Sequence, residues 1–136
     1  MKTKTTKPIT QRVKTYEGAC KVLGIDPKKL PNVSGIAKEL RNYILAHYKL
    51  TIITQALNEG WTPDWSNTDQ WKYLVCSRIK ATQKNPHGSG FVDSDFNFWS
   101  THSFVSSRLL YKSSELALYS SKQFKKLWKD YIIISK

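Results

Sequence analysis

The stretch Arg108-Leu-Leu-Tyr-Lys-Ser-Ser-Glu-Leu-Ala-Leu-Tyr119, continued as far as Tyr131, decides the fold. An apolar segment leads into Ser-Ser-Glu, which is typical of a helix start, and the residues that follow have helical periodicity. This helix should cover a core with one face and present ammonium groups on the other. The apolar face holds Leu116, Ser120, Phe124, Leu127, Trp128 and Tyr131, and the basic face holds Lys122, Lys125, Lys126 and Lys129.

Five further segments have the pattern of regular secondary structure. Thr15 and Gly24 are suited to begin and end a short helix, and a wide apolar arc over residues 35–58 predicts a central one. The order α-α-β-β-β-α indicates an α+β fold, in which a three-stranded antiparallel meander packs helices on one face. The expected strands cover residues 72–82, 91–99 and 104–112.

The charge of the chain is strongly positive and lies at its ends. Lys and Arg number 22 against 10 Asp and Glu, which gives a formal net charge of +12. Residues 1–14 hold five basic and no acidic residues and include Pro8, so we expect a flexible basic arm, followed by a single α+β domain over residues 15–136. Such a balance predicts attraction to nucleic acid, an anionic surface or an acidic protein.

The sequence also bears on the compartment. No apolar run reaches the roughly 18 residues of a membrane span, and the first residues lack the apolar core of a secretory signal. Cys20 and Cys76 are expected to be free thiols in a reducing compartment. We therefore expect a protein of a cytosol, without a membrane partner.

Several longer motifs lie along the chain. They are Tyr-x-x-Ala-Cys-Lys-Val-Leu-Gly-Ile-Asp-Pro over 16–27, Ala46-His-Tyr-Lys-Leu50, Ala-Leu-Asn-Glu-Gly-Trp-Thr-Pro-Asp-Trp-Ser-Asn over 56–67, Ser107-Arg-Leu with Tyr-Lys-Ser-Ser-Glu-Leu-Ala up to 117, and Lys122-Gln-Phe124. Together they resemble a family of small proteins encoded by tailed phages and prophages of Bacteroidetes hosts, crAss-like phages among them. The resemblance extends from about residue 16 to residue 131. It implies a phage source, with host cytoplasm or virion as the location, and no particular activity.

The basic residues suggest contact with nucleic-acid phosphates. Spaced ammonium groups neutralise backbone phosphates and release counterions, which gives affinity without sequence choice. A solvated helix face is the alternative, because cations also suit a helix C-terminus. The predicted phosphate contacts are Lys122, Lys125, Lys126 and Lys129, a second patch of Arg78, Lys80 and Lys112, and the arm from Lys2 to Lys14.

The aromatic residues allow two interpretations. Trp61, Trp65 and Trp71 occupy one loop, where they either cap the core or anchor a protein–protein interface. Alternating residues in the first strand place Lys72, Arg78 and Lys80 on an outer face, and with Trp65, Trp71 and Tyr73 this face could stack bases of a single strand. For Tyr73 a core position is the alternative.

No catalytic, cofactor or metal motif is recognisable in the sequence. A glycine-rich phosphate loop, a nucleophile elbow and cysteines at zinc spacing are all missing. We therefore expect a non-enzymatic phage protein that binds nucleic acid; the alternatives are an auxiliary, capsid-associated virion protein and an inhibitor of a host protein. His47 is expected in the core, His87 and His102 in loops, and Asp93 and Asp95 as surface charges on a strand.

Overall fold

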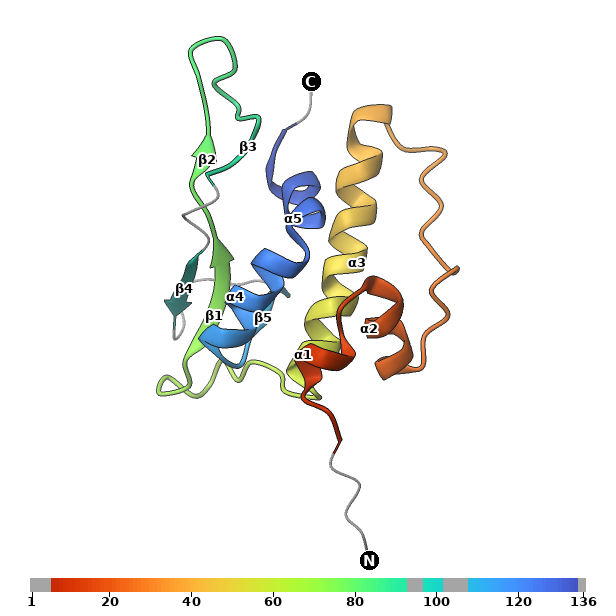
Figure 1. The fold of residues 1–136 in the computed structure, drawn as a ribbon, viewed down its shortest axis with the longest axis vertical. Helices are drawn as coiled ribbons and strands as arrows, with labels where there is room; N and C mark the ends of the chain where they lie inside the picture. Colours follow the sequence, from red (N-terminus) through yellow and green to blue (C-terminus); the bar gives the residue numbers. More distant parts are fainter. Residues whose placement is uncertain (1–5, 93–96, 102–107, 135–136) are drawn as a thin grey trace, which may run out of the picture.

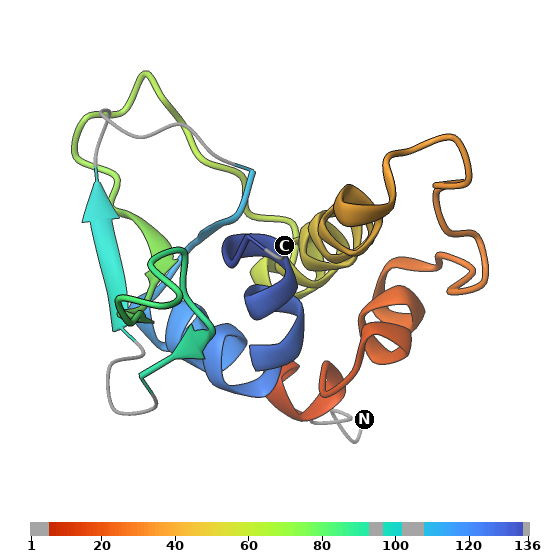
Figure 2. The same ribbon diagram turned by 90° about the horizontal axis from the view of Figure 1, so that it is seen from above.

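A computed structural model describes residues 6–92, 97–101 and 108–134, and confirms the α+β class. The molecule has layers: the sheet lies on one side, α4 and α5 lie next to it, and α3 and α2 follow on the far side (Figures 1 and 2). No helix in the described part is long and apolar enough to cross a membrane. The helices are α1 (Ile9–Arg12), α2 (Tyr16–Leu23), the 3-10 helix η1 (Lys38–Leu40), α3 (Arg41–Asn58), α4 (Ser114–Gln123) and α5 (Lys125–Ile132). The strands are β1 (Lys72–Cys76), β2 (Ile79–Lys80), β3 (Gly90–Phe91), β4 (Asn97–Thr101) and β5 (Leu110–Tyr111).

The strands are antiparallel, as expected, but the meander order is wrong. The three-stranded sheet has the order β4-β1-β5, so the first strand in the chain is the central one. The expected strand over 72–82 is two strands, because the chain leaves the sheet after Cys76 and β2 pairs with β3 in a separate ribbon. The alternation of side chains continues across this break, which is why the pattern reads as one strand.

Local signals place the first of the expected helices correctly. Thr15 caps α2, since its hydroxyl accepts a hydrogen bond from the Gly18 N–H at 3.0 Å, and Gly24 ends it with a φ of 68°. The central helix begins only at Arg41, six residues later than expected. The Arg41 guanidinium donates to the carbonyls of Ser34 and Ile36, which holds the preceding segment in a loop.

The prediction of a flexible arm over residues 1–14 is wrong from Ile9 onward. Residues 9–12 form α1, and the side chains of Ile9 and Val13 are buried in the hydrophobic core. These two residues are four apart, and with Tyr16 and Cys20 they continue one helical repeat into α2. The folded domain therefore begins near Pro8.

A buried chain of hydrogen bonds joins four elements at the centre of the molecule. The Tyr111 hydroxyl of β5 donates to Ser120 Oγ of α4 at 2.7 Å and lies 2.9 Å from Thr54 Oγ1 of α3. The Trp128 indole of α5 donates to the same Ser120 oxygen at 3.1 Å. Burial raises the pKa of Tyr111 to about 12, so this hydroxyl keeps its proton at neutral pH.

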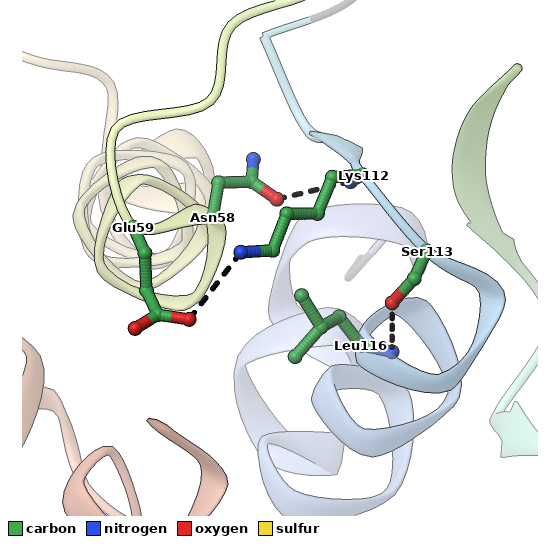
Figure 3. A network of polar contacts seen from close by, with 5 residues as sticks. All are labelled: Asn58, Glu59, Lys112, Ser113 and Leu116. Carbon is green, nitrogen blue, oxygen red and sulfur yellow. Dashed lines mark hydrogen bonds and ion pairs between the residues drawn. The ribbon is translucent and has the colours of Figure 1, made fainter. Parts of the chain in front are cut away.

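The outer edge of β5 is closed by the end of α3. Asn58 Nδ2 donates to the Leu110 carbonyl at 2.7 Å, and its Oδ1 accepts from the Lys112 N–H at 3.1 Å. One amide side chain thus replaces a neighbouring strand at an edge that would otherwise be unpaired. Beside it the Ser113 hydroxyl caps α4 by accepting from the Leu116 N–H (Figure 3).

Replacing Tyr111 by Phe should destabilise the protein by about 1–3 kcal/mol, because Thr54 loses its buried partner and Ser120 one of two. Tyr48→Phe is the matched control, since that hydroxyl makes only a 3.4 Å contact with the Lys29 carbonyl at the surface. Urea unfolding measures both variants. Equal midpoints for Tyr111→Phe and Tyr48→Phe would show that the buried chain does not stabilise the fold.

Candidate nucleic-acid interface

The C-terminal helix that carries the predicted basic face is two helices. It breaks at Phe124, whose φ of −111° and ψ of 33° end α4 and begin α5. The apolar face is confirmed, since Leu116, Ser120, Phe124 and Trp128 are buried and the others partly buried. The sequence shows no break because Phe124 and Trp128 keep the helical spacing on both sides of it.

The four lysines of the predicted basic face are all exposed. Lys122 is on α4, whereas Lys125, Lys126 and Lys129 are on α5, so they do not form a single straight stripe. Lys126 pairs with Asp130 at 3.1 Å, but its side chain remains 87% exposed. A surface pair of this kind is weak, so Lys126 stays available to an anionic partner.

The basic residues at the two ends of the chain are brought together. Tyr119 Oη lies 2.7 Å from the Thr10 carbonyl oxygen and 2.8 Å from that of Val13, and these two acceptors share its single proton. Gln123 Nε2 donates to the Lys14 carbonyl at 2.9 Å. Figures 1 and 2 show α1 beside the blue α4–α5 segment. We define the terminal basic surface as the exposed residues Lys7, Arg12, Lys14, Lys122, Lys125, Lys126 and Lys129.

The predicted second patch is not one patch. Lys112 follows β5 and lies near the start of β1, because Tyr111 pairs with Tyr73. Arg78 and Lys80 follow the other end of β1, about 16 Å along the strand. Lys112 also forms an ion pair with Glu59 at 3.3 Å (Figure 3), whereas Arg78 and Lys80 are exposed near or on the ribbon.

Lys72, expected on an outer basic face, is fully buried at 0% exposure. Its ammonium group donates to the carbonyls of Gln70 at 3.0 Å and Asn67 at 3.4 Å, and lies 5.1 Å from the centre of the Trp65 ring. A buried ammonium group is stable only with such partners. The Lys72 side chain therefore holds the aromatic loop, residues 61–71, against the sheet and does not face a ligand. The prediction that it lies on an outer, base-stacking face of the strand is wrong.

The three tryptophans of the loop lie at its surface rather than within the core. Trp65 is 41% and Trp71 50% exposed, and Trp61 is partly buried. Trp61 and Trp65 line a hollow of about 540 Å³ between the loop and the C-terminal half of α3. Arg108 lines the same hollow from the segment before β5, which the sequence reasoning did not anticipate.

The remaining titratable residues do not form a reactive centre within the described ranges. His47 is partly buried beside the stacked rings of Tyr43 and Tyr131, whose centres are 6.1 and 5.1 Å from its own, and His87 is exposed. Both cysteines are free thiols, as predicted, and burial raises the pKa of Cys76. Among the described residues no group of three or more His, Cys, Asp or Glu could hold a metal ion. His102, Asp93 and Asp95 lie outside these residues.

The N-terminal part of the terminal basic surface could be predicted from the sequence, but the hollow could not. The four-residue spacing of Ile9 and Val13 marks the start of the fold and so places Lys14 in it. Arg108 and Gln55 are 53 positions apart, and their segments are brought together by the packing of β5 on α3 through Asn58 and Thr54.

Tyr119→Phe should loosen residues 8–14, because two carbonyls lose their donor. Tryptic cleavage after Arg12 and Lys14 should become about tenfold faster, as expected from the loss of 1–2 kcal/mol of local stability. Cleavage is followed by mass spectrometry, with Tyr48→Phe as the control. If both sites are cut equally fast in the wild type and in Tyr119→Phe, the N-terminal segment is not held by α4.

Comparisons with models of protein families, with curated proteins and with solved structures find no match. The resemblance to phage proteins therefore stays a prediction.

Proposed function

We propose that this protein is a non-enzymatic phage protein that binds nucleic acid, mainly through its backbone phosphates. The observation that carries the proposal is the convergence of two basic segments from opposite ends of the chain. Residues 6–14 and 122–129 contain seven Lys and Arg and no Asp or Glu. Hydrogen bonds from Tyr119 and Gln123 hold these segments together, so their charges act on one partner.

The chemistry of the terminal basic surface suits phosphates better than a specific sequence. It consists mostly of lysines, which are mobile point charges, and Lys makes weaker directional contacts than the planar fork of Arg. Such cations neutralise phosphates and release condensed counterions, which makes binding steeply dependent on salt. The break at Phe124 spreads the lysines over two helix axes, which suits a curved backbone more than a flat surface.

Replacing Lys14, Lys122 and Lys126 together by Ala should weaken binding to duplex DNA equally for different sequences. The slope of log K against log salt should become shallower by about 0.9 for each phosphate contact that is lost. Fluorescence anisotropy of labelled duplexes at several salt concentrations measures both effects.

The matched control removes three exposed lysines from other parts of the molecule: Lys28 and Lys29 from the loop after α2, and Lys84 from the hairpin after β2. It changes the net charge by the same amount and should keep most of the slope. An equal loss in both triple variants would reduce the proposal to a general charge effect. A loss confined to one DNA sequence would also contradict it.

A second candidate function is binding to a protein, as an auxiliary capsid-associated protein or an inhibitor of a host protein would require. A hollow of about 660 Å³ lies between the start of α3 and the end of α5, and its lining includes the exposed side chains of Leu40, Tyr43 and Ile134. Exposed apolar groups gathered in this way favour a protein partner. Failure of the wild type to bind duplexes at low salt would favour this candidate over the first.

A further inference from the structure

We infer that the hollow between the aromatic loop and α3 is a binding site for a nucleotide unit, meaning a base that carries a phosphate. This inference goes beyond phosphate contact at the terminal basic surface and does not depend on it. Its volume of about 540 Å³ is within the range of small-molecule sites. Its lining combines two indole rings, a guanidinium and an amide, supplied by Trp61, Trp65, Arg108 and Gln55.

The indole rings provide the surface for a base. Trp65 is 41% exposed although the Lys72 ammonium lies over its ring, so a large part of the indole remains open. Base stacking on an aromatic side chain is favourable for every base, which makes two neighbouring tryptophans a general platform. The hydrogen bonds from Lys72 to the Asn67 and Gln70 carbonyls hold the loop in place before a ligand arrives.

The polar groups of the hollow fit the rest of a nucleotide. The Arg108 side chain is exposed, and within the described part of the chain neither its guanidinium nor the Gln55 side-chain amide makes a hydrogen bond or an ion pair. Arg binds phosphate through two parallel N–H groups, and an amide reads the edge of a base in the same bidentate way. None of the described residues that line the hollow is acidic, and Arg108 is the one charged side chain among them.

The hollow is separate from the terminal basic surface. The loop after α3 and the segment before β5 lie on the opposite side of the helix layer from α1 in Figure 2. A base and its phosphate can therefore occupy the hollow while the lysines contact another part of a strand or nothing. The nucleotide unit comes either from a free mononucleotide or from the phosphorylated end of a single strand, and the experiment below separates these sources.

The test is a titration of the full chain with adenosine monophosphate and, in parallel, with adenosine, observed through the ¹⁵N-labelled indole signals. Adenosine monophosphate should shift the Trp61 and Trp65 signals with a dissociation constant of about 1 mM or tighter, and adenosine should bind about tenfold more weakly. Arg108→Ala should remove that difference by weakening only the phosphorylated ligand, and Gln55→Ala should weaken both. The control Lys28→Ala removes an exposed cation from the loop after α2, outside both the hollow and the terminal basic surface, and should change neither.

A 5′-phosphorylated single strand that displaces adenosine monophosphate identifies a strand end as the source, and one that does not identifies a free nucleotide. The inference is overturned if neither indole signal shifts at several millimolar ligand, or if Lys28→Ala weakens binding as much as Arg108→Ala. It also fails if adenosine and its monophosphate bind equally well. Duplex binding by Arg108→Ala should equal that of the wild type, so failure here is distinct from failure of the phosphate-contact proposal.

Discussion

The buried hydroxyl of Tyr111 is the interaction on which the arrangement of the other elements depends. It lies in a short edge strand and bonds to α3 through Thr54 and to α4 through Ser120, while Trp128 of α5 bonds to the same serine. Buried polar groups are costly unless every partner is present, so this chain of bonds permits few other packings of helices on the sheet. Asn58 adds to the constraint by pairing with the outer edge of β5.

The functional surfaces follow from this central packing. The bend at Phe124 brings the Trp128 indole within hydrogen-bond distance of Ser120 Oγ. The lysines of the helix are therefore distributed over two helical segments. The outer side of α4 then presents Tyr119 and Gln123 to the backbone of residues 10–14, which places the Lys14 carbonyl against Gln123, the neighbour of Lys122 in the chain. At the other side, the end of α3 and the start of β5 form two walls of the hollow that Trp61 and Trp65 complete.

The structural features that could be predicted from the sequence are those determined by neighbouring residues. The caps at Thr15 and Ser113 and the exposed lysines after Ser121 were all predictable from a few neighbouring residues. The helix α1 was not predicted, although Ile9 and Val13 have helical spacing, because four residues are too few to outweigh the surrounding Lys and Thr.

Other features depend on distant parts of the chain. Alternation placed Lys72 outside, yet the loop before it supplies two carbonyls and an indole, which make burial of the ammonium group possible. The sheet order has the same origin, since two strands that follow β1 pair with its two edges. Arg108 and Gln55 line the same hollow only in the complete fold, and no spacing in the sequence indicates that they lie near each other.

The most direct test of the central claim is chemical-shift mapping of the backbone amides during titration with a short duplex. The account predicts that the amides around Lys14 and Lys122 shift together, with the same apparent dissociation constant, because one surface carries both segments. Amides around Arg78 and Lys112 should change little. Shifts confined to only one end of the chain, or centred on the β2–β3 ribbon, would contradict the account.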